Sequence, residues 1–197
     1  MTRRLLFTAR SPFARKVRIV LAEKRLECEL VEIDLQNRSA EFIKTSPLGK
    51  VPVLIEDDET VVFDSSVIVD YLEDRYPTPR MLGLEWRERL LNRALDELAD
   101  TLADNAISAY FAVSRGEPIA RERALALAQR ALGELDRRAA VGEWPTDFSS
   151  GDAAVISALG YFELRLGREL LAPFTSLRAQ AERHAMRPSV ASTVPKG

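Results

Sequence analysis

The chain of 197 residues contains one cysteine and one histidine. With Cys28 as the single thiol, no disulfide can form within the chain and no thiolate cluster can hold a metal, so we expect no metal cofactor. We expect Cys28 to be a small, half-buried residue beside a strand. No motif pairs a serine with the lone His184 for hydrolysis. Any chemistry must therefore use other groups.

Long apolar runs and an excess of one charge are also lacking. No run approaches the roughly 18 apolar residues that indicate a membrane span. The opening stretch MTRRLLFTARSPF has no long apolar core of a secretion signal. The formal net charge is only -2, which does not favour the strong phosphate binding of nucleic-acid proteins. We expect a cytoplasmic protein that uses neither a membrane nor a nucleic acid as a partner.

The first 77 residues alternate between strand and helix patterns. The short apolar run Leu5–Thr8 precedes a helical spacing of apolar residues from Phe13 onward, and Leu30–Leu35 alternates as a half-buried strand does. A short helix around EFIK, two strands (VPVLIE and VVF) and a helix in DSSVIVDYLEDRYP follow. The predicted order is βαβαββα.

From Glu85 onward strand patterns disappear and apolar residues recur at helical spacing. Ser149 and Asp152 have the spacing of a capping box at the start of one of these helices. The segment PTPRMLGL is the candidate linker. We therefore predict an α/β domain over residues 1–77, a linker over 78–84 and an all-helical bundle over 85–197.

Three short motifs in the first half point to one ligand site. Ser11 lies at a strand-to-helix turn, where free amide groups and the positive helix end favour an anion, although a serine before a proline can also be a simple helix cap. The Val51-Pro52 pair opens a strand and can turn its backbone toward a peptide-like ligand, or can be a structural turn only. Asp64-Ser65 starts a helix, where amide groups can hold a carboxylate and Asp64 an ammonium group.

The motifs SPFARKVRIVLAEK, SPLGKVPVL and FDSSVIVDYLEDRYP, in this order, resemble those of the soluble glutathione S-transferase family, most closely its serine-type members and bacterial relatives. The resemblance extends to FSSGDAAVISAL and RPSV in the helical half and so covers essentially the whole chain. It implies a thioredoxin-like domain followed by a helical domain, glutathione as co-substrate, and a homodimer.

The resemblance also implies roles for individual residues. Ser11 matches the hydroxyl that hydrogen-bonds the glutathione sulfur. Tyr110 and Phe111 follow an apolar helical stripe and can be core residues, but the resemblance also makes them, with Arg10, candidates for the acceptor pocket. Arg10 and Arg15 are expected to be solvated surface charges that can add positive potential. The remaining glutathione contacts are expected from Phe13, Arg38, Lys50, Val51, Pro52, Asp64 and Ser65.

The predicted function is conjugation of the glutathione thiolate to a small hydrophobic electrophile, a detoxification chemistry. Two alternatives stay open. One is a non-catalytic protein of this fold that acts through protein partners in a stress response. The other is a glutathione-dependent isomerase, dehalogenase or lyase. Serine at position 11 argues only against thiol-disulfide exchange by the protein itself.

Overall fold

The computed structural model describes residues 2–196. Its first half contains a four-stranded sheet in the order β2-β1-β3-β4, in which β1 runs parallel to β2 and antiparallel to β3, and β3 runs antiparallel to β4. The strands are β1 (Arg4–Phe7), β2 (Glu29–Glu32), β3 (Val53–Ile55) and β4 (Val61–Val62). This mixed sheet and its helices confirm the predicted thioredoxin-like order βαβαββα.

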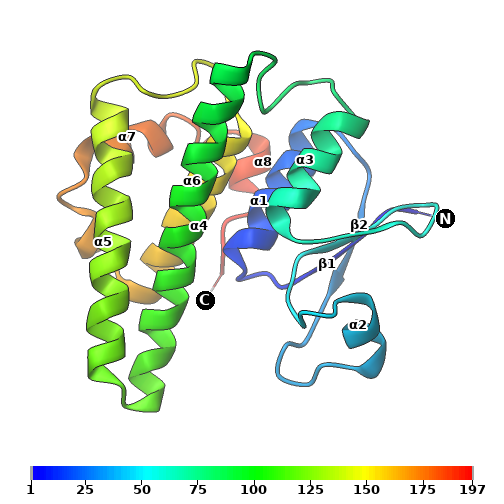
Figure 1. Cartoon of the computed structure of the whole chain (residues 1–197), viewed down its shortest axis with the longest axis horizontal. Helices are drawn as coiled ribbons and strands as arrows, with labels where there is room; N and C mark the ends of the chain where they lie inside the picture. Colours follow the sequence, from blue (N-terminus) through cyan, green and yellow to red (C-terminus); the bar gives the residue numbers. More distant parts are fainter. Residues whose placement is uncertain (1, 197) are drawn as a thin grey trace.

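The sheet is covered on both faces because side chains alternate along its strands. Leu5 and Phe7 of β1 face the helices α1 (Pro12–Glu23) and α3 (Ser65–Arg75), whereas Leu6 between them packs in a separate cluster with Phe42 of α2 (Ala40–Thr45). In Figure 1, α1 and α3 lie between the sheet and the long helices of the second half. These two helices therefore carry the contact between the two halves of the molecule.

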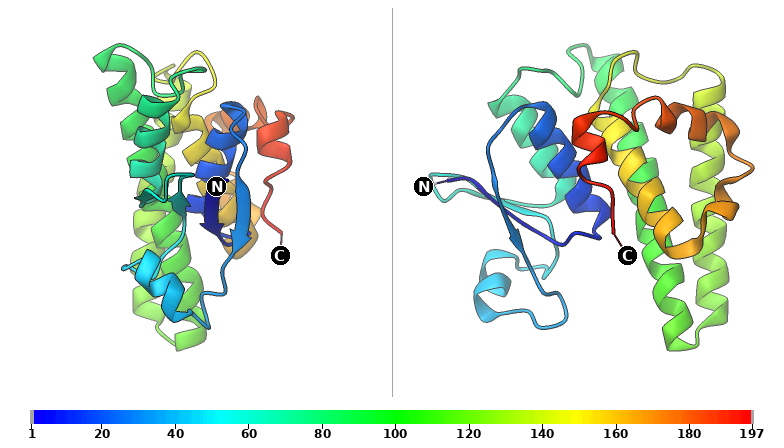
Figure 2. Two further views of the ribbon diagram at one scale, coloured as in Figure 1. Left: turned by 90° about the vertical axis from the view of Figure 1, so that its right-hand side faces the viewer. Right: turned by 180° about the vertical axis from the view of Figure 1, so that it is seen from behind.

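The second half is helical, as predicted. Its elements are α4 (Trp86–Arg115), α5 (Pro118–Ala140), α6 (Ser150–Leu166), the 3-10 helix η1 (Arg168–Leu171), α7 (Thr175–Glu182) and α8 (Pro188–Ala191). Ser149 and Asp152 form the predicted capping box of α6. The two further views show the segment after α8 running beside α1 toward the end at which α1 begins (Figure 2). None of the helices within residues 2–196 has the length and apolar character needed to cross a bilayer.

Three basic side chains, two on α1 and one at its C-cap, are buried, and for Arg15 this corrects the sequence-based expectation. Arg15, expected to be a solvated surface charge, is 4% exposed and donates hydrogen bonds to the carbonyl groups of Ile156 (3.1 Å) and Val190 (3.3 Å). Lys24, the C-cap of α1, is also buried and pairs with Glu73 at 2.8 Å. Lys16, on the same helix, is the third buried cation, at 1% exposure. These charges are buried because acceptors from distant parts of the chain surround them, and burial of a charge requires such partners.

Candidate functional site

The sheet topology brings the three sequence motifs to the same end of the sheet, where these strands begin or end. Ser11 follows the end of β1, and the Val51-Pro52 pair precedes β3, which is antiparallel to β1 with Leu6 opposite Val53. Asp64 follows the end of β4, which is antiparallel to β3 with Leu54 opposite Val62. Neighbouring antiparallel strands run in opposite directions. The end of β1, the start of β3 and the end of β4 therefore lie at the same end of the sheet. The three motifs therefore form one constellation.

Ser11 is the N-cap of α1. Its Oγ accepts a hydrogen bond from the backbone N–H of Ala14 at 3.1 Å, and Pro12 occupies the first helical position, where no N–H is needed. The side chain is half-buried. Because the oxygen acts as an acceptor toward the helix, the hydroxyl hydrogen can still donate to a neighbouring atom. An anionic sulfur placed there would receive that hydrogen bond and the favourable potential of the helix start.

Val51 presents its backbone groups just before the start of β3. The Val51-Pro52 peptide bond is cis, and Ser46 holds the preceding residue by donating to the carbonyl group of Lys50 at 2.8 Å. Within residues 2–196, neither the N–H nor the C=O of Val51 takes part in a backbone hydrogen bond. Buried backbone groups of this kind normally have a partner, so this pair is suited to an extended ligand.

Asp64 caps α3 and remains exposed. Its Oδ1 accepts hydrogen bonds from the backbone N–H groups of Ser66 (3.2 Å) and Val67 (3.5 Å), which leaves Oδ2 for another group. Ser65 is buried at the first position of the helix, where its backbone N–H is not part of the helical ladder. An amino-acid head group fits here, with its ammonium at Asp64 and its carboxylate at the helix start.

Two basic residues and one unpredicted acid complete this region. Lys50 is exposed, and Arg38 passes Gly49 so closely that a Cβ added there would lie 3.6 Å from its Cδ. Burial raises the pKa of Asp104 on α4, Lys50 opposes this effect, and the charge of Asp64 adds to it. The structure therefore brings Lys50, Asp64 and Asp104 within electrostatic range. Sequence reasoning missed Asp104, because a lone acid on a long helix resembles a solvated surface residue.

Behind Ser65 lies a buried charge network that was also missed. Lys16 donates to Oδ1 of Asp96 at 2.6 Å, to both carboxylate oxygens of Asp100 at 3.1 Å, and to Oγ of Ser66 at 3.1 Å. Burial raises the pKa of Asp100 to about 6, and the repulsion from Asp96 adds to this rise, while Lys16 opposes it. The spacing of the two aspartates by one helical turn was the available signal. The network fixes the start of α3 against α4.

The predicted acceptor residues gather near the start of α1. Tyr110 and Phe111, on the last turns of α4, form an edge-to-face pair with ring centroids 5.2 Å apart. Arg165 of α6 was not predicted, and its guanidinium lies 4.4 Å from the ring centroid of Tyr110 and 5.7 Å from that of Tyr161. Burial raises the pKa of Tyr161, and the positive charges of Arg165 and Arg10 oppose this rise. Arg10 is exposed, as expected.

Phe13 connects this group to the start of α1. Its side chain packs against the hydrophobic core of the helical half, the same cluster that contains Tyr161. Sequence reasoning assigned Phe13 to the glutathione site, and the structure places its side chain at the contact between α1 and the helical half.

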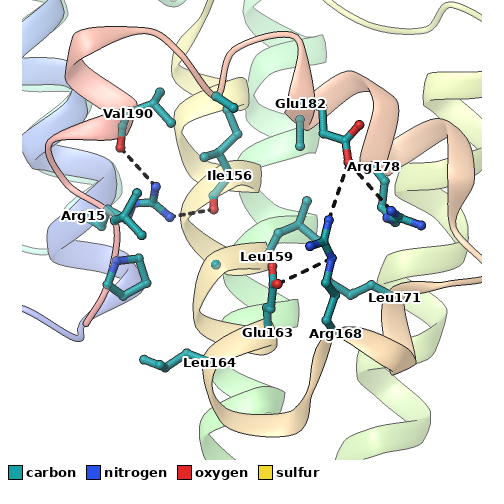
Figure 3. Close-up of a pocket in the computed structure, with 15 residues that line it drawn as sticks. Arg15, Ile156, Leu159, Glu163, Leu164, Arg168, Leu171, Arg178, Glu182 and Val190 are labelled. Carbon is teal, nitrogen blue, oxygen red and sulfur yellow. Dashed lines mark hydrogen bonds and ion pairs between the residues drawn. The ribbon is translucent and has the colours of Figure 1, made fainter. Parts of the chain in front are cut away.

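A separate cavity of about 430 Å³ lies between α6, α7 and the segment after α8. Figure 3 shows Arg15 at one end of it and Arg168 and Arg178 at the other, where both approach Glu182. The distances from these two guanidinium groups to the Glu182 carboxylate are 3.9 Å and 3.8 Å, and the three side chains are substantially exposed. None of the predicted site residues lines this cavity. It is therefore distinct from the candidate site formed by the three motifs at the end of the sheet.

Comparison with known proteins identifies the family. Residues 5–80 match the model of the glutathione S-transferase N-terminal domain. A glutathione S-transferase of Methylobacillus flagellatus, solved with glutathione bound, is 32% identical with a TM-score of 0.91 over 99% of this chain and 100% of that chain. One from Methylobacterium radiotolerans, solved with glutathione sulfonate, is 30% identical with a TM-score of 0.92 over 100% of this chain and 96% of that chain.

The chain therefore belongs to the glutathione S-transferase family. Alignments with curated relatives are shorter. Three of them span only 33%, 58% and 38% of the relative's own length. A stringent starvation protein A homolog of Haemophilus influenzae is 36% identical over 83 residues, which is 42% of this chain and 39% of that protein.

Proposed function

We propose that the protein is a glutathione transferase in which Ser11 holds the sulfur of bound glutathione as a thiolate that attacks a small electrophile. The observation that carries this proposal is the Ser11 hydroxyl, whose oxygen accepts the N–H of Ala14 while its hydrogen can donate to sulfur. In the reaction a carbon–sulfur bond forms and the leaving group of the acceptor departs with the electron pair of the broken bond.

The remaining groups suit the rest of a tripeptide thiol. The backbone of Val51 can pair with the central residue, since its own groups make no backbone hydrogen bonds in residues 2–196. Asp64 and the amide of Ser65 can hold the γ-glutamyl ammonium and carboxylate. The proposed glutathione site comprises Ser11, Arg38, Lys50, Val51, Pro52, Asp64 and Ser65, together with the backbone of Phe13 at the start of α1.

The energetics of Ser11 are adequate for this role. A free thiol with a pKa near 8.5 is only a few per cent ionised at neutral pH, and lowering the pKa by two units requires about 2.7 kcal/mol. One hydrogen bond to a charged group supplies about 1.5–3 kcal/mol, and the start of a helix about 0.3–1 kcal/mol. The hydroxyl and the helix start together match the requirement.

The test is to titrate glutathione into the wild type and Ser11→Ala by calorimetry and to follow the thiolate absorbance of the complex over pH. We expect a depressed thiol pKa in the wild type and a rise of about one to two units in Ser11→Ala, with a much smaller change in affinity. Ser39→Ala is the matched control, because Ser39 caps α2 with the same 3.1 Å hydrogen bond and lies outside the proposed sulfur position. Equal losses of affinity and ionisation would contradict the proposal.

A second candidate is a protein of this fold that acts through protein partners. The similarity to the Haemophilus stringent starvation protein A homolog favours it. This alternative predicts no glutathione binding at millimolar concentration in the same calorimetric experiment. It also predicts that Ser11→Ala leaves the capture of a partner protein unchanged.

Isomerisation, reductive dehalogenation and lysis are enzymatic alternatives that use the same thiolate. Product analysis separates them from conjugation, because only conjugation leaves glutathione covalently attached to the acceptor at the end of the reaction. We propose conjugation because the residues beyond Ser11 are aromatic and basic and suit the binding of an acceptor molecule.

We further propose that the chain forms a homodimer and consists of two domains, 1–77 and 85–197, joined by 78–84. Three large apolar side chains, Val67 on α3 and Trp86 and Leu90 on α4, are 51%, 64% and 60% exposed and are available for an interface between two copies of the chain. Sedimentation of the wild type and of Leu90→Glu tests this: a dimer that the variant dissociates supports it, and a monomeric wild type contradicts it.

A further inference from the structure

Arg165 is held in place but has no carboxylate partner within residues 2–196. It donates from Nη1 to the hydroxyl of Tyr110 at 3.3 Å, its guanidinium carbon lies 4.4 Å and 5.7 Å from the ring centroids of Tyr110 and Tyr161, and its Nε is buried with no hydrogen-bond partner. Many other arginines of the chain do reach carboxylates, including Arg93, Arg137 and Arg187. A partly buried guanidinium without an anion is unfavourable, and such a group favours an anionic ligand.

Arg10 adds a second positive charge at the same place. It precedes Ser11 directly and is exposed, and Phe13, three residues further on, packs against the cluster that contains Tyr161. The charge of Arg10 also opposes the rise that burial causes in the pKa of Tyr161. Within residues 2–196 neither Arg10 nor Arg165 is part of an ion pair. The nearby acid Glu32 accepts a hydrogen bond from the backbone N–H of Ala9 at 3.3 Å instead.

The surroundings of these two charges are aromatic. Tyr110 and the buried Tyr161 lie beside Arg165, and Phe111 packs edge-to-face on Tyr110. Tyr110 and Phe111 are 36% and 48% exposed. A guanidinium stacked on a ring keeps its planar set of N–H donors in one orientation, which suits two-point binding of a carboxylate. The combination fits a molecule with an apolar body and one carboxylate group.

We propose that the electrophile conjugated by this protein carries a carboxylate, which Arg165 binds with help from Arg10 while the aromatic side chains contact its apolar body. This inference rests on the proposed function, since it places the acceptor next to the sulfur held by Ser11. It replaces the expectation of a purely hydrophobic acceptor by a specific charged class.

The experiment compares two glutathione derivatives that differ in one group. The wild type is titrated by calorimetry with S-(4-carboxybenzyl)glutathione and with the uncharged S-(4-carbamoylbenzyl)glutathione, and glutathione itself is the reference. We expect the carboxylate derivative to bind about tenfold more tightly than the amide, as one charge-assisted hydrogen-bonded pair would give. In Arg165→Gln this preference should disappear, while the Kd for glutathione changes less than about threefold.

Two further variants separate a specific role from a general one. Arg165→Lys keeps the charge without the planar donors and should retain part of the preference. Arg168→Gln removes an exposed arginine that lines the separate cavity of Figure 3, and it should keep the full preference. Thermal unfolding of each variant is measured alongside, so that a folding defect is recognised before affinities are compared.

Each outcome bears on the inference. Equal affinities for the two derivatives in the wild type, or a preference that survives in Arg165→Gln, would overturn it while leaving glutathione binding and the proposed function intact. Absence of binding by glutathione and by both derivatives would overturn the proposed function together with the inference. A preference that is lost in Arg165→Gln and kept in Arg168→Gln supports both.

Discussion

The ammonium group of Lys16 lies 2.6 Å from Oδ1 of Asp96, and the two side chains are 1% and 7% exposed. Lys16 belongs to α1 and Asp96 to α4, so this ion pair crosses the contact between the sheet-containing half and the helical half. Asp100 and Ser66 complete the coordination of the same ammonium group. The two halves are thus joined by a buried, fully hydrogen-bonded charge as well as by apolar packing.

Lys16→Met should destabilise the protein strongly, because it leaves Asp96 and Asp100 without their buried cation. Removal of one partner of a buried ion pair costs about 3–5 kcal/mol. Urea denaturation measures the loss, and Arg4→Met is the control: Arg4 pairs with Glu59 at 3.0 Å, but these side chains are 35% and 52% exposed. The control should change stability by less than about 1 kcal/mol. Similar losses for the two variants would contradict the role of burial.

Asp100 should give the stability an identifiable pH dependence. Burial raises its pKa to about 6 in the folded protein, from an ordinary value of 3.8. The folded state therefore binds more protons than the unfolded state between these two values, so the contribution of Asp100 to stability decreases as pH rises through this window. We expect Asp100→Asn to gain stability relative to the wild type from about pH 4 to 6, with no further gain above about pH 7. A constant difference between the two curves would refute this assignment.

Asp64 should separate helix capping from ligand binding. Asn is as good an N-cap as Asp, so Asp64→Asn should keep the stability of the protein, whereas Asp64→Ala should lose about 1 kcal/mol. Both variants lack the charge proposed to hold the γ-glutamyl ammonium, and both should bind glutathione about tenfold more weakly or worse. Thermal unfolding and calorimetry measure the two effects independently. Normal affinity in Asp64→Asn would remove Asp64 from the proposed site.

Cys28 should be an unreactive thiol. Burial raises its pKa to about 11, and the positive charge of Arg3 opposes a smaller part of this rise. At pH 8 its thiolate fraction is then about two-hundredfold smaller than that of a free cysteine with a pKa near 8.5. A disulfide reagent such as Ellman's reagent should react correspondingly slowly with the native protein and rapidly after denaturation. Fast labelling of the native protein would show that this thiol is accessible and ionised.

The sequence predicts the order of the elements well because the signals are local. The apolar alternation of the strands, the proline and serine at the start of α1 and the capping box at Ser149 each depend on neighbouring residues, and the structure has all of them. The motif trio was also readable, since the topology of the sheet brings the ends of its strands together.

The buried charges were not predictable in this way. Helical spacing identifies the apolar face of α1, but Lys16 and Arg15 are buried by partners from α4, α6 and α8, more than 75 residues away in the sequence. Arg165 likewise resembles an ordinary cation near the end of a helix, where it would interact favourably with the helix dipole. Tyr161 lies four residues earlier on the same helix, but only the arrangement of α4 beside α6 reveals the ring and hydroxyl of Tyr110.

The ion pair between Lys16 and Asp96 also limits how such proteins can be recombined. A chimera that takes residues 1–84 from a relative with an apolar residue at the position of Lys16 would leave Asp100 without its cation and Asp96 with Arg93 as its remaining cation. Exchange of halves between homologues should therefore succeed only where the cation and the acids are inherited together. In laboratory evolution of this scaffold, we expect Lys16, Asp96 and Asp100 to change together or not at all. We expect substitutions at the ends of α4 and α6 to be independent of these three positions.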